Sequence, residues 1–533
     1  MRLLITLLVL FSSVLQAQNL HSGGTLKPEQ AIMDIRHYTI ALNVNPTEQS
    51  IDGYTIVTMK LTAATPSIVL DFWHGLTTSK VTVNNKPATF DHSDKDVLTI
   101  KGTGDFKPGT YNVKVFYAGK PGVAQRPPWT GGFQWTTDGQ GNPWVAITCQ
   151  SEGGKIFFPC KDHPSDEPNE GADLIITVPK GLTVAAAGLL KKVKNNEVEK
   201  NTTTFHWSTG YTIANYNLVF NIGNYQKVSR TYTTIDNHKV PLEFYVLVEH
   251  NMNANRLLDF VERSAHVLEK YFGEYPWVKE KIGVVETPHL GMEHQTAIAY
   301  GNKFNFTQMG GKDFDWLMHH EFGHEWWGNK VTNRDWAHMW IQEGICTFGD
   351  HLFTREMEGE EAYLARMRQT GRQTQNLKPI VQGDAVDSDQ TYQPDIYGKG
   401  AFFMHTLRYV MGDSLFFPTL KKLATDPQYT YDNTVTTDDV EKLFSSAAGK
   451  DLKPLFDLYL RTINKLEIEV KQVSDAQYNV KLLNYPASLP LDIEVDGKIT
   501  RRMVGESAVS VDSKSGAPGI DPKGYYLKVV TVK

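Results

Sequence analysis

Alternating hydrophobic and polar residues characterise the first part of the chain, from about residue 34 to residue 222. Residues 38–44 and 111–117 alternate strictly, as strands with one buried and one solvent-facing side do. Turn-forming pairs such as Asn84-Asn85 separate these stretches. The pattern predicts an N-terminal all-β domain, which we expect to span residues 18–228.

The hydrophobic period becomes helical in the middle of the chain. Apolar residues at spacings of three and four predict a helix over 257–268, which Gly273 and Pro276 end. Candidate strands at 242–248 and 282–285 flank this helix. Further helices are predicted over 360–369, 400–411 and 437–448. This mixture predicts an α/β domain over residues 229–462.

Strand-like alternation returns near the C-terminus, at 466–470, 480–482 and 527–529. It predicts a small β domain over residues 463–533. The fold class expected from the whole pattern is therefore multidomain α+β.

The first 17 residues have the composition of a secretory signal peptide. Met1-Arg2 supplies a basic start, an apolar run covers residues 3–15, and Gln16-Ala17 offers a small residue for cleavage. The run is too short to span a membrane, and no later apolar run reaches that length. We expect an exported protein, periplasmic or secreted, without stable membrane insertion.

The overall composition excludes some partners. Hydrophobic residues make up 41% and charged residues 21% of the chain, which is ordinary for a soluble globular protein. The net charge of −6 argues against nucleic acid or an anionic membrane surface as a partner.

One short motif carries metal chemistry: His320-Glu321-Phe322-Gly323-His324. Residues at spacings of three and four recur from Trp316 to Trp327, so we expect helical structure over this stretch. Residues four apart lie on one face of a helix, so the two imidazoles can reach a single metal ion. Glu321 follows the first histidine on the same turn and can face the same cleft without being a ligand. That is the placement of a general base beside a water that a metal activates.

A second segment supplies a third ligand. Residues 336–344 also read as helical, and a helix that returns antiparallel would bring Glu343 to the metal. Two histidines, one carboxylate and one open position are typical of catalytic zinc, so we expect one Zn²⁺ per chain. The metzincin alternative requires a histidine six residues after His324, where the chain has Lys330.

The three cysteines of the chain have a smaller role. At least one of them lacks a disulfide partner, and Cys149 and Cys160 could bridge across a hairpin, although sequence does not determine the pairing. Cys346 lies about one helical turn after Glu343. It reads as a packed thiol rather than a metal ligand.

The segment from His320 to Val331, followed by Trp340-Ile-Gln-Glu343-Gly344, resembles the zinc-binding core of the aminopeptidase N and leukotriene-hydrolase family. The resemblance implies a zinc aminopeptidase that acts on peptides with a free N-terminus. It also implies a thermolysin-like catalytic domain and a C-terminal β-sandwich. We expect a short form of this family, without the large C-terminal helical domain that most members have.

The resemblance extends to residues that would bind the substrate. Gly291-Met292-Glu293-His294 is similar to the family motif Gly-x-Met-Glu-Asn, with Leu290 and His294 in place of the glycine and the asparagine. Glu293 would bind the α-ammonium group with help from Gln150, and the backbone at Gly291 and Met292 would contact the peptide.

Three further residues, in the segment 389–400, match family positions. Tyr397 corresponds to the tyrosine that donates to the oxyanion, and Tyr392 to a second, supporting tyrosine. Asp389 lies where one branch places an acid that favours arginine side chains. Two alternatives stay open: the opening of a lipid epoxide, which one branch performs, and a non-catalytic binding scaffold.

Overall fold

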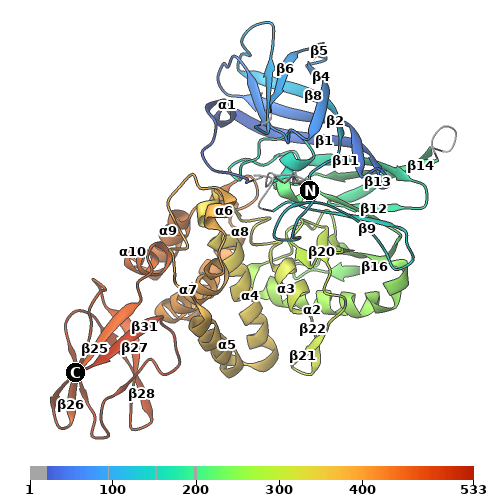
Figure 1. Ribbon diagram of the computed structural model, residues 1–533. Helices are drawn as coiled ribbons and strands as arrows, with labels where there is room; N and C mark the ends of the chain where they lie inside the picture. Colours follow the sequence, from blue (N-terminus) through green and yellow to red (C-terminus); the bar gives the residue numbers. More distant parts are fainter. Residues whose placement is uncertain (1–20, 94, 151–152, 197–200) are drawn as a thin grey trace, which may run out of the picture.

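The computed structural model describes residues 21–93, 95–150, 153–196 and 201–533 (Figure 1). The predicted signal peptide lies outside this part of the chain. No helix in the described part is long and apolar enough to cross a membrane. Three regions follow one another along the chain: β, mixed α/β, and β.

The N-terminal region is built on an eight-stranded sheet, and its all-β character is confirmed. The strands in spatial order are β13 (Leu189–Asn196), β14 (Thr202–Thr209), β11 (Ala172–Pro179), β1 (Met33–Asn45), β2 (Ser50–Leu61), β8 (Gly109–Gly119), β4 (Leu76–Val83) and β5 (Lys86–Pro87). The alternating stretches 38–44 and 111–117 lie within β1 and β8. Only β1 and β11 pair in parallel within this sheet.

Two smaller sheets complete this region. One has β3 (Ile68–Asp71), β7 (Val97–Lys101) and β6 (Thr89–Ser93); the other has β12 (Thr183–Ala186), β15 (Phe220–Gly223), β10 (Pro143–Thr148) and β9 (Gly132–Thr137). Gln150, which the family resemblance assigns to substrate binding, follows the end of β10 in the second sheet by two residues. Cys149 and Cys160 are both buried here and form no disulfide bond with each other.

The middle region combines a five-stranded sheet with a helical part (Figure 1). The sheet order is β16 (Tyr225–Thr233), β17 (Lys239–Leu247), β18 (Ile282–Glu286), β20 (Ile298–Tyr300) and β19 (Gly291–Met292). The helices are α2 (Ala254–Phe272), α3 (Trp316–Gly323), α4 (Trp340–Glu358), α5 (Glu360–Gln373), α6 (Ser388–Thr391), α7 (Asp395–Met411), α8 (Asp413–Thr425), α9 (Thr437–Ala448) and α10 (Lys453–Phe456). The helices predicted over 257–268, 360–369, 400–411 and 437–448 are all present.

The helix that carries the metal motif is shorter than its sequence pattern predicts. Asp315 caps its N-terminus by accepting from the backbone N–H of Met318 at 3.1 Å, and the helix ends at Gly323. The prediction that helical structure continues to Trp327 is wrong. The chain reverses there instead, because Gly328, at φ +113°, donates its N–H to the carbonyl of Val331.

The C-terminal region contains two further sheets, so the predicted return to β structure is confirmed. They are β29 (Val509–Asp512), β26 (Gln477–Leu482), β25 (Leu466–Ser474) and β31 (Lys528–Val532), and then β28 (Lys498–Val504), β27 (Leu489–Val495) and β30 (Gly519–Ile520). This region lies at the far end of the molecule from the N-terminal sheets (Figure 1). It is joined to α7 through Tyr409, whose ring stacks on Tyr525 and whose hydroxyl donates to Asp492 at 2.7 Å.

Candidate metal centre and substrate cleft

Three side chains predicted to hold a metal converge where α3 ends and α4 begins. His320 lies in the last turn of α3, His324 caps its C-terminus, and Glu343 lies in the first turn of α4. The Nε2 atoms of the two histidines are 3.3 Å apart. Oε2 of Glu343 lies 3.3 Å from Nε2 of His324 and 3.7 Å from Nε2 of His320. The three donor atoms form a compact triangle.

The opposite nitrogen of each imidazole faces a hydrogen-bond acceptor. Nδ1 of His320 donates to Oδ2 of Asp350 at 3.0 Å, and Nδ1 of His324 donates to the carbonyl oxygen of Trp327 at 2.8 Å. Because these partners only accept, the protons lie on Nδ1 and both Nε2 atoms present lone pairs. Two lone pairs and a carboxylate oxygen that face one another repel unless a cation lies among them.

The donor triangle has the size of a tetrahedral zinc site. With ligand distances of about 2.0–2.1 Å, two tetrahedral ligands stand about 3.3–3.4 Å apart. The separations of 3.3, 3.3 and 3.7 Å agree with this geometry. Oε2 of Glu343 is buried and has no hydrogen-bond partner among the described residues. The residues therefore fit a metal ion that prefers nitrogen and oxygen ligands.

Cys346 lies close to this triangle but has another partner. Its sulfur is within 4.8 Å of nitrogen atoms of His320 and His324. The thiol donates to the carbonyl oxygen of His320 at 3.0 Å, and a β-carbon at Gly323 would lie 2.7 Å from the sulfur. The thiol thus packs between α3 and α4, as the sequence indicated.

Glu321 lies beside the triangle without belonging to it. Its side chain lines the same cavity as His320 and His324. One of its oxygens lies within 4.8 Å of donor atoms of Glu293 and His324. Burial raises the pKa of Glu321 to about 8, so its carboxyl group readily takes up a proton.

Two tyrosines lie close together near this site: Tyr392 caps the C-terminus of α6, and Tyr397 lies in the first turn of α7. The hydroxyl groups of Tyr392 and Tyr397 are 3.0 Å apart, and the ring of Tyr397 lies 6.1 Å from that of His320. Burial, followed by the charge of Glu343, raises the pKa of Tyr397 well above 10. The phenol of Tyr397 therefore stays protonated and can donate a hydrogen bond toward the metal site.

A buried hydrogen-bond network surrounds Glu293. Its Oε1 accepts from Nε2 of Gln150 at 2.7 Å, from the hydroxyl of Tyr216 at 3.1 Å and from Nε2 of Gln342 at 2.9 Å. Gln150 also donates to Oε1 of Glu343 at 3.0 Å, so it joins the acid to the metal triangle. Burial raises the pKa of Glu293. A cationic ligand would offset the cost of that buried charge.

Three residues of the site were not found by sequence reasoning. Asp350 follows Glu343 by seven residues in α4, two helical turns on, and this spacing could have indicated it. Gln342 precedes Glu343 and carried no signal of its own. Tyr216 lies in the N-terminal region, and no motif connects it with Glu293.

These side chains surround one cavity of about 520 Å³. It is lined by Pro128, Trp129, Gln150, Leu290, Gly291, Met292, Glu293, Trp316, Leu317, His320, Glu321, His324, Glu343, Tyr392, Pro394 and Tyr397. Asp389 is exposed on α6 and is not among the lining residues. His294 is fully buried, and neither ring nitrogen has a hydrogen-bond partner in the described part of the chain.

Two family models match the chain. The "Peptidase M1 N-terminal domain" matches residues 35–216, and the "Peptidase family M1 domain" matches residues 256–459, which include the metal triangle, Glu321 and Tyr397. Together the two matches span well over half of the chain.

Individual proteins are similar to this chain at low sequence identity. A leucyl aminopeptidase of Saccharolobus solfataricus is 23% identical over 72% of this chain and 51% of its own length. A leukotriene A-4 hydrolase of Xenopus laevis is 23% identical over 78% of this chain and 68% of its own length. The match thus spans about half of the first of these relatives.

The fold has counterparts among solved structures. An M1 zinc metallopeptidase mutant from Deinococcus radiodurans, solved with a Tyr-Ser-Ala substrate, superposes with a TM-score of 0.67 at 22% identity. The superposition covers 82% of this chain and 95% of that protein. With both domain models matched in sequence order and the same fold in solved M1 structures, the chain belongs to the M1 peptidase family.

Proposed function

We propose that the protein is a zinc-dependent aminopeptidase that releases N-terminal amino acids from peptides. One observation carries this proposal: a metal triangle, a separate acid and a carboxylate held by three donors line the same cavity. The triangle supports metal-assisted hydrolysis, and the held carboxylate supports selection of a free amine. The name of one relative, a leucyl aminopeptidase, agrees with this reaction.

His320, His324 and Glu343 would hold the zinc ion, which supplies Lewis acidity to the substrate carbonyl and to the attacking water when it is bound. Glu321 takes the proton of the attacking water and passes it to the leaving amine. Tyr397 donates its hydroxyl hydrogen to the oxygen on which negative charge develops.

Glu293 would make the enzyme an exopeptidase. The three donors to the buried carboxylate of Glu293 are Gln150, Tyr216 and Gln342, and all of them are neutral. The α-ammonium group of a peptide would supply the positive charge that balances this carboxylate. An ammonium group bound at Glu293 places the first peptide bond, and no later one, beside the metal triangle. Gly291 and Met292 line the same cavity, where their backbone would contact the bound peptide.

Hydrolysis of aminoacyl chromogenic amides and of their N-acetylated counterparts tests the proposal. We expect cleavage of the free-amine forms alone, loss of that activity on chelation, and recovery with zinc. Equal cleavage of the acetylated forms would refute the role of Glu293. The variant Glu321→Gln should bind zinc like the wild type and cleave nothing, which separates metal binding from catalysis.

The structure also supports finer proposals about architecture and location. The five-stranded sheet followed by a helical part supports a thermolysin-like catalytic domain, and the two C-terminal sheets support a small β-sandwich. The sequence of residues 1–17 supports export through a signal peptide, to the periplasm or the medium. N-terminal sequencing of the mature protein tests the export step.

A further inference from the structure

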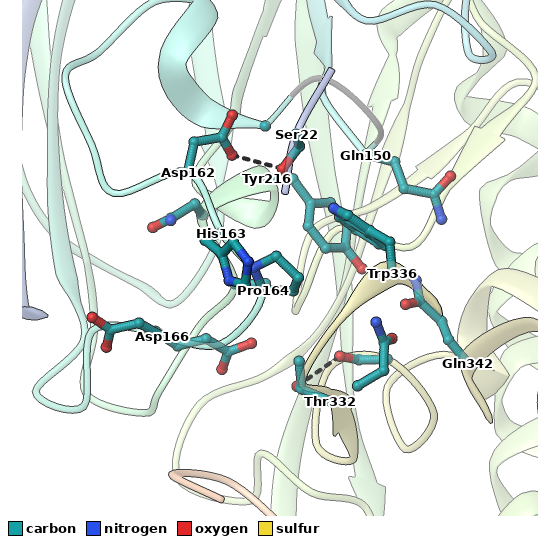
Figure 2. Close-up of a pocket in the computed structure, with 16 residues that line it drawn as sticks. Ser22, Gln150, Asp162, His163, Pro164, Asp166, Tyr216, Thr332, Trp336 and Gln342 are labelled. Carbon is teal, nitrogen blue, oxygen red and sulfur yellow. Dashed lines mark hydrogen bonds between the residues drawn. The ribbon is translucent and has the colours of Figure 1, made fainter. Parts of the chain in front are cut away.

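A second, smaller cavity lies behind the amine-binding network, where the N-terminal region meets the catalytic region. Its volume is about 30 Å³, which exceeds the roughly 10–15 Å³ needed for one water molecule. Figure 2 shows Asp162, Tyr216, Trp336 and Gln342 approaching it from different parts of the chain. Tyr216 and Gln342 also donate to Glu293, so the two cavities share a wall.

Oxygen atoms without partners are concentrated in the residues that line this cavity. Among the lining residues, Oδ2 of Asp162 and the N–H donor Nε1 of Trp336 lack a hydrogen-bond partner in the described part of the chain. The same is true of Oε1 of Glu167, Oδ1 of Asn215 and Oδ1 of Asn333, which are buried acceptors. The three residues are 7%, 8% and 1% exposed, respectively. Buried acceptors of this kind are normally paired, so their concentration at one cavity indicates a ligand.

The orientation of the two amides is fixed by their other ends. Nδ2 of Asn215 donates to the carbonyl oxygen of Lys161, and Nδ2 of Asn333 donates to the carbonyl oxygen of Asp335 at 2.9 Å. A carbonyl oxygen only accepts, so neither amide can be turned around without the loss of a bond. Both Oδ1 atoms therefore remain as acceptors.

The charges around the cavity leave one acid without a cationic partner. Asp166 is paired with Lys161 at 2.7 Å, and Asp162 with Lys155 at 3.5 Å. Oε2 of Glu167 accepts from the hydroxyl of Thr212 at 3.1 Å, and the hydroxyl of Thr332 also lowers the pKa of this acid, but both groups are neutral. The described groups thus carry one unbalanced negative charge when Glu167 is ionised.

We propose that this cavity binds one monovalent metal cation of sodium or potassium size through the oxygens of Glu167, Asn215 and Asn333. Hard oxygen donors select such ions over soft metals. A single charge balances Glu167, whereas a divalent ion would leave an excess positive charge. The volume leaves room for one ion and little accompanying water.

The shared wall predicts a second effect, which rests on the function proposed above. A cation that orders Tyr216 and Gln342 also orders two of the three donors to Glu293, so it should lower KM for free-amine substrates. Its effect on stability does not depend on peptidase activity, so the two ideas can fail separately.

Thermal unfolding of the full chain in sodium, potassium and choline chloride at equal ionic strength, at pH 8, tests the site. We expect Tm to be about 2–4 °C higher in the sodium or potassium salt than in choline chloride, because an ion that binds only the folded state stabilises it. Glu167→Gln should abolish the difference. Glu280→Gln, at another buried acid that does not line the cavity, should keep it.

A direct measurement covers the case in which Glu167→Gln fails to fold. Crystals of the wild-type protein soaked in a thallium(I) or rubidium salt should show anomalous density in this cavity. Equal Tm values in all three salts, a salt response that survives in Glu167→Gln, or a cavity without anomalous density would each overturn the proposal.

Discussion

Gly344 and Gly400 touch where α4 crosses α7. A β-carbon built on either residue would lie 2.8 Å from the α-carbon of the other. Gly344 directly follows Glu343, which we propose as a metal ligand, and Gly400 follows Tyr397 by three residues, close to one helical turn. The absence of two side chains thus helps to bring Glu343 and Tyr397, the proposed third metal ligand and the proposed oxyanion donor, to the same cavity.

This crossing predicts that Gly400→Ala damages catalysis. The added methyl group meets backbone, which cannot rotate away, so α7 must shift and carry Tyr397 with it. We expect a loss of about 1–3 kcal/mol in stability and a fall in kcat of about tenfold or more. Unfolding curves and steady-state kinetics would measure both effects.

The same helix offers a matched control for Gly400→Ala. A β-carbon on Gly398 would meet Thr370 at 3.6 Å, which is an ordinary contact, so Gly398→Ala should leave kcat unchanged. If both variants retain wild-type kcat, the close crossing does not set the position of Tyr397.

The hydrogen bond between His320 and Asp350 predicts that the variant Asp350→Asn binds its metal ion more weakly than the wild type. Asp350→Asn keeps the shape of the side chain but weakens the acceptor that fixes the tautomer and orientation of His320. Loss of such a partner typically costs about 10–100-fold in metal affinity. Competition with a chelator of known affinity would measure it. Asp389→Asn removes an exposed acid outside the cavity and should bind zinc like the wild type; equal affinities for all three proteins would exclude the role of Asp350.

The sequence could indicate that the candidate metal ligands of the first helix lie close together because their spacing is local. His320, Glu321 and His324 lie within a single turn of chain, and a helical period is enough to place them together. Gln150 and Glu293 required the family resemblance, since the distance between them in sequence carries no geometric information. Tyr216 could not be found either way, because its hydrogen bond to Glu293 depends on how two regions pack.

The fold shows the same division between local and tertiary information. Strand alternation predicted β1 and β8, and apolar spacing predicted α2 and α9, because one face of each is buried. The end of α3 was misplaced because Trp327 continues the helical spacing of apolar residues. Gly328 and its hydrogen bond to Val331 reverse the chain there, so the helix ends although the apolar spacing continues.

The hydroxyl groups of Tyr397 and Tyr392 are 3.0 Å apart, and we expect the two tyrosines to contribute unequally to catalysis. Tyr397→Phe removes the donor to the oxyanion, and kcat should fall by about 10²–10³ with little change in KM. Tyr392→Phe leaves that donor in place and removes only its neighbour, so we expect a smaller loss. Kinetics on one free-amine substrate would compare the two. A larger loss for Tyr392→Phe would reverse the assignment.

The buried acid Glu167 predicts how stability depends on pH in the absence of a small cation. Burial raises its pKa from 4.5 to about 8, the hydroxyl groups of Thr212 and Thr332 lower it, and the charges of Asp166 and Asp432 raise it further. Between pH 4.5 and about pH 8, Glu167 keeps a proton in the folded state that it has lost in the unfolded state. The contribution of Glu167 to stability is therefore complete below pH 4.5 and declines as pH rises toward 8.

Unfolding of the wild type and of Glu167→Gln in choline chloride, from pH 5 to pH 8, measures this contribution. The glutamine does not titrate, so the stability of the wild type relative to the variant should fall steadily as pH rises. Sodium or potassium should reduce that fall, because a bound cation favours the ionised carboxylate. If the stability of the two proteins changes with pH in the same way in choline chloride, Glu167 ionises as easily in the folded chain as in the unfolded one. The negative charge that we assign to the cavity would then already have a partner in the protein.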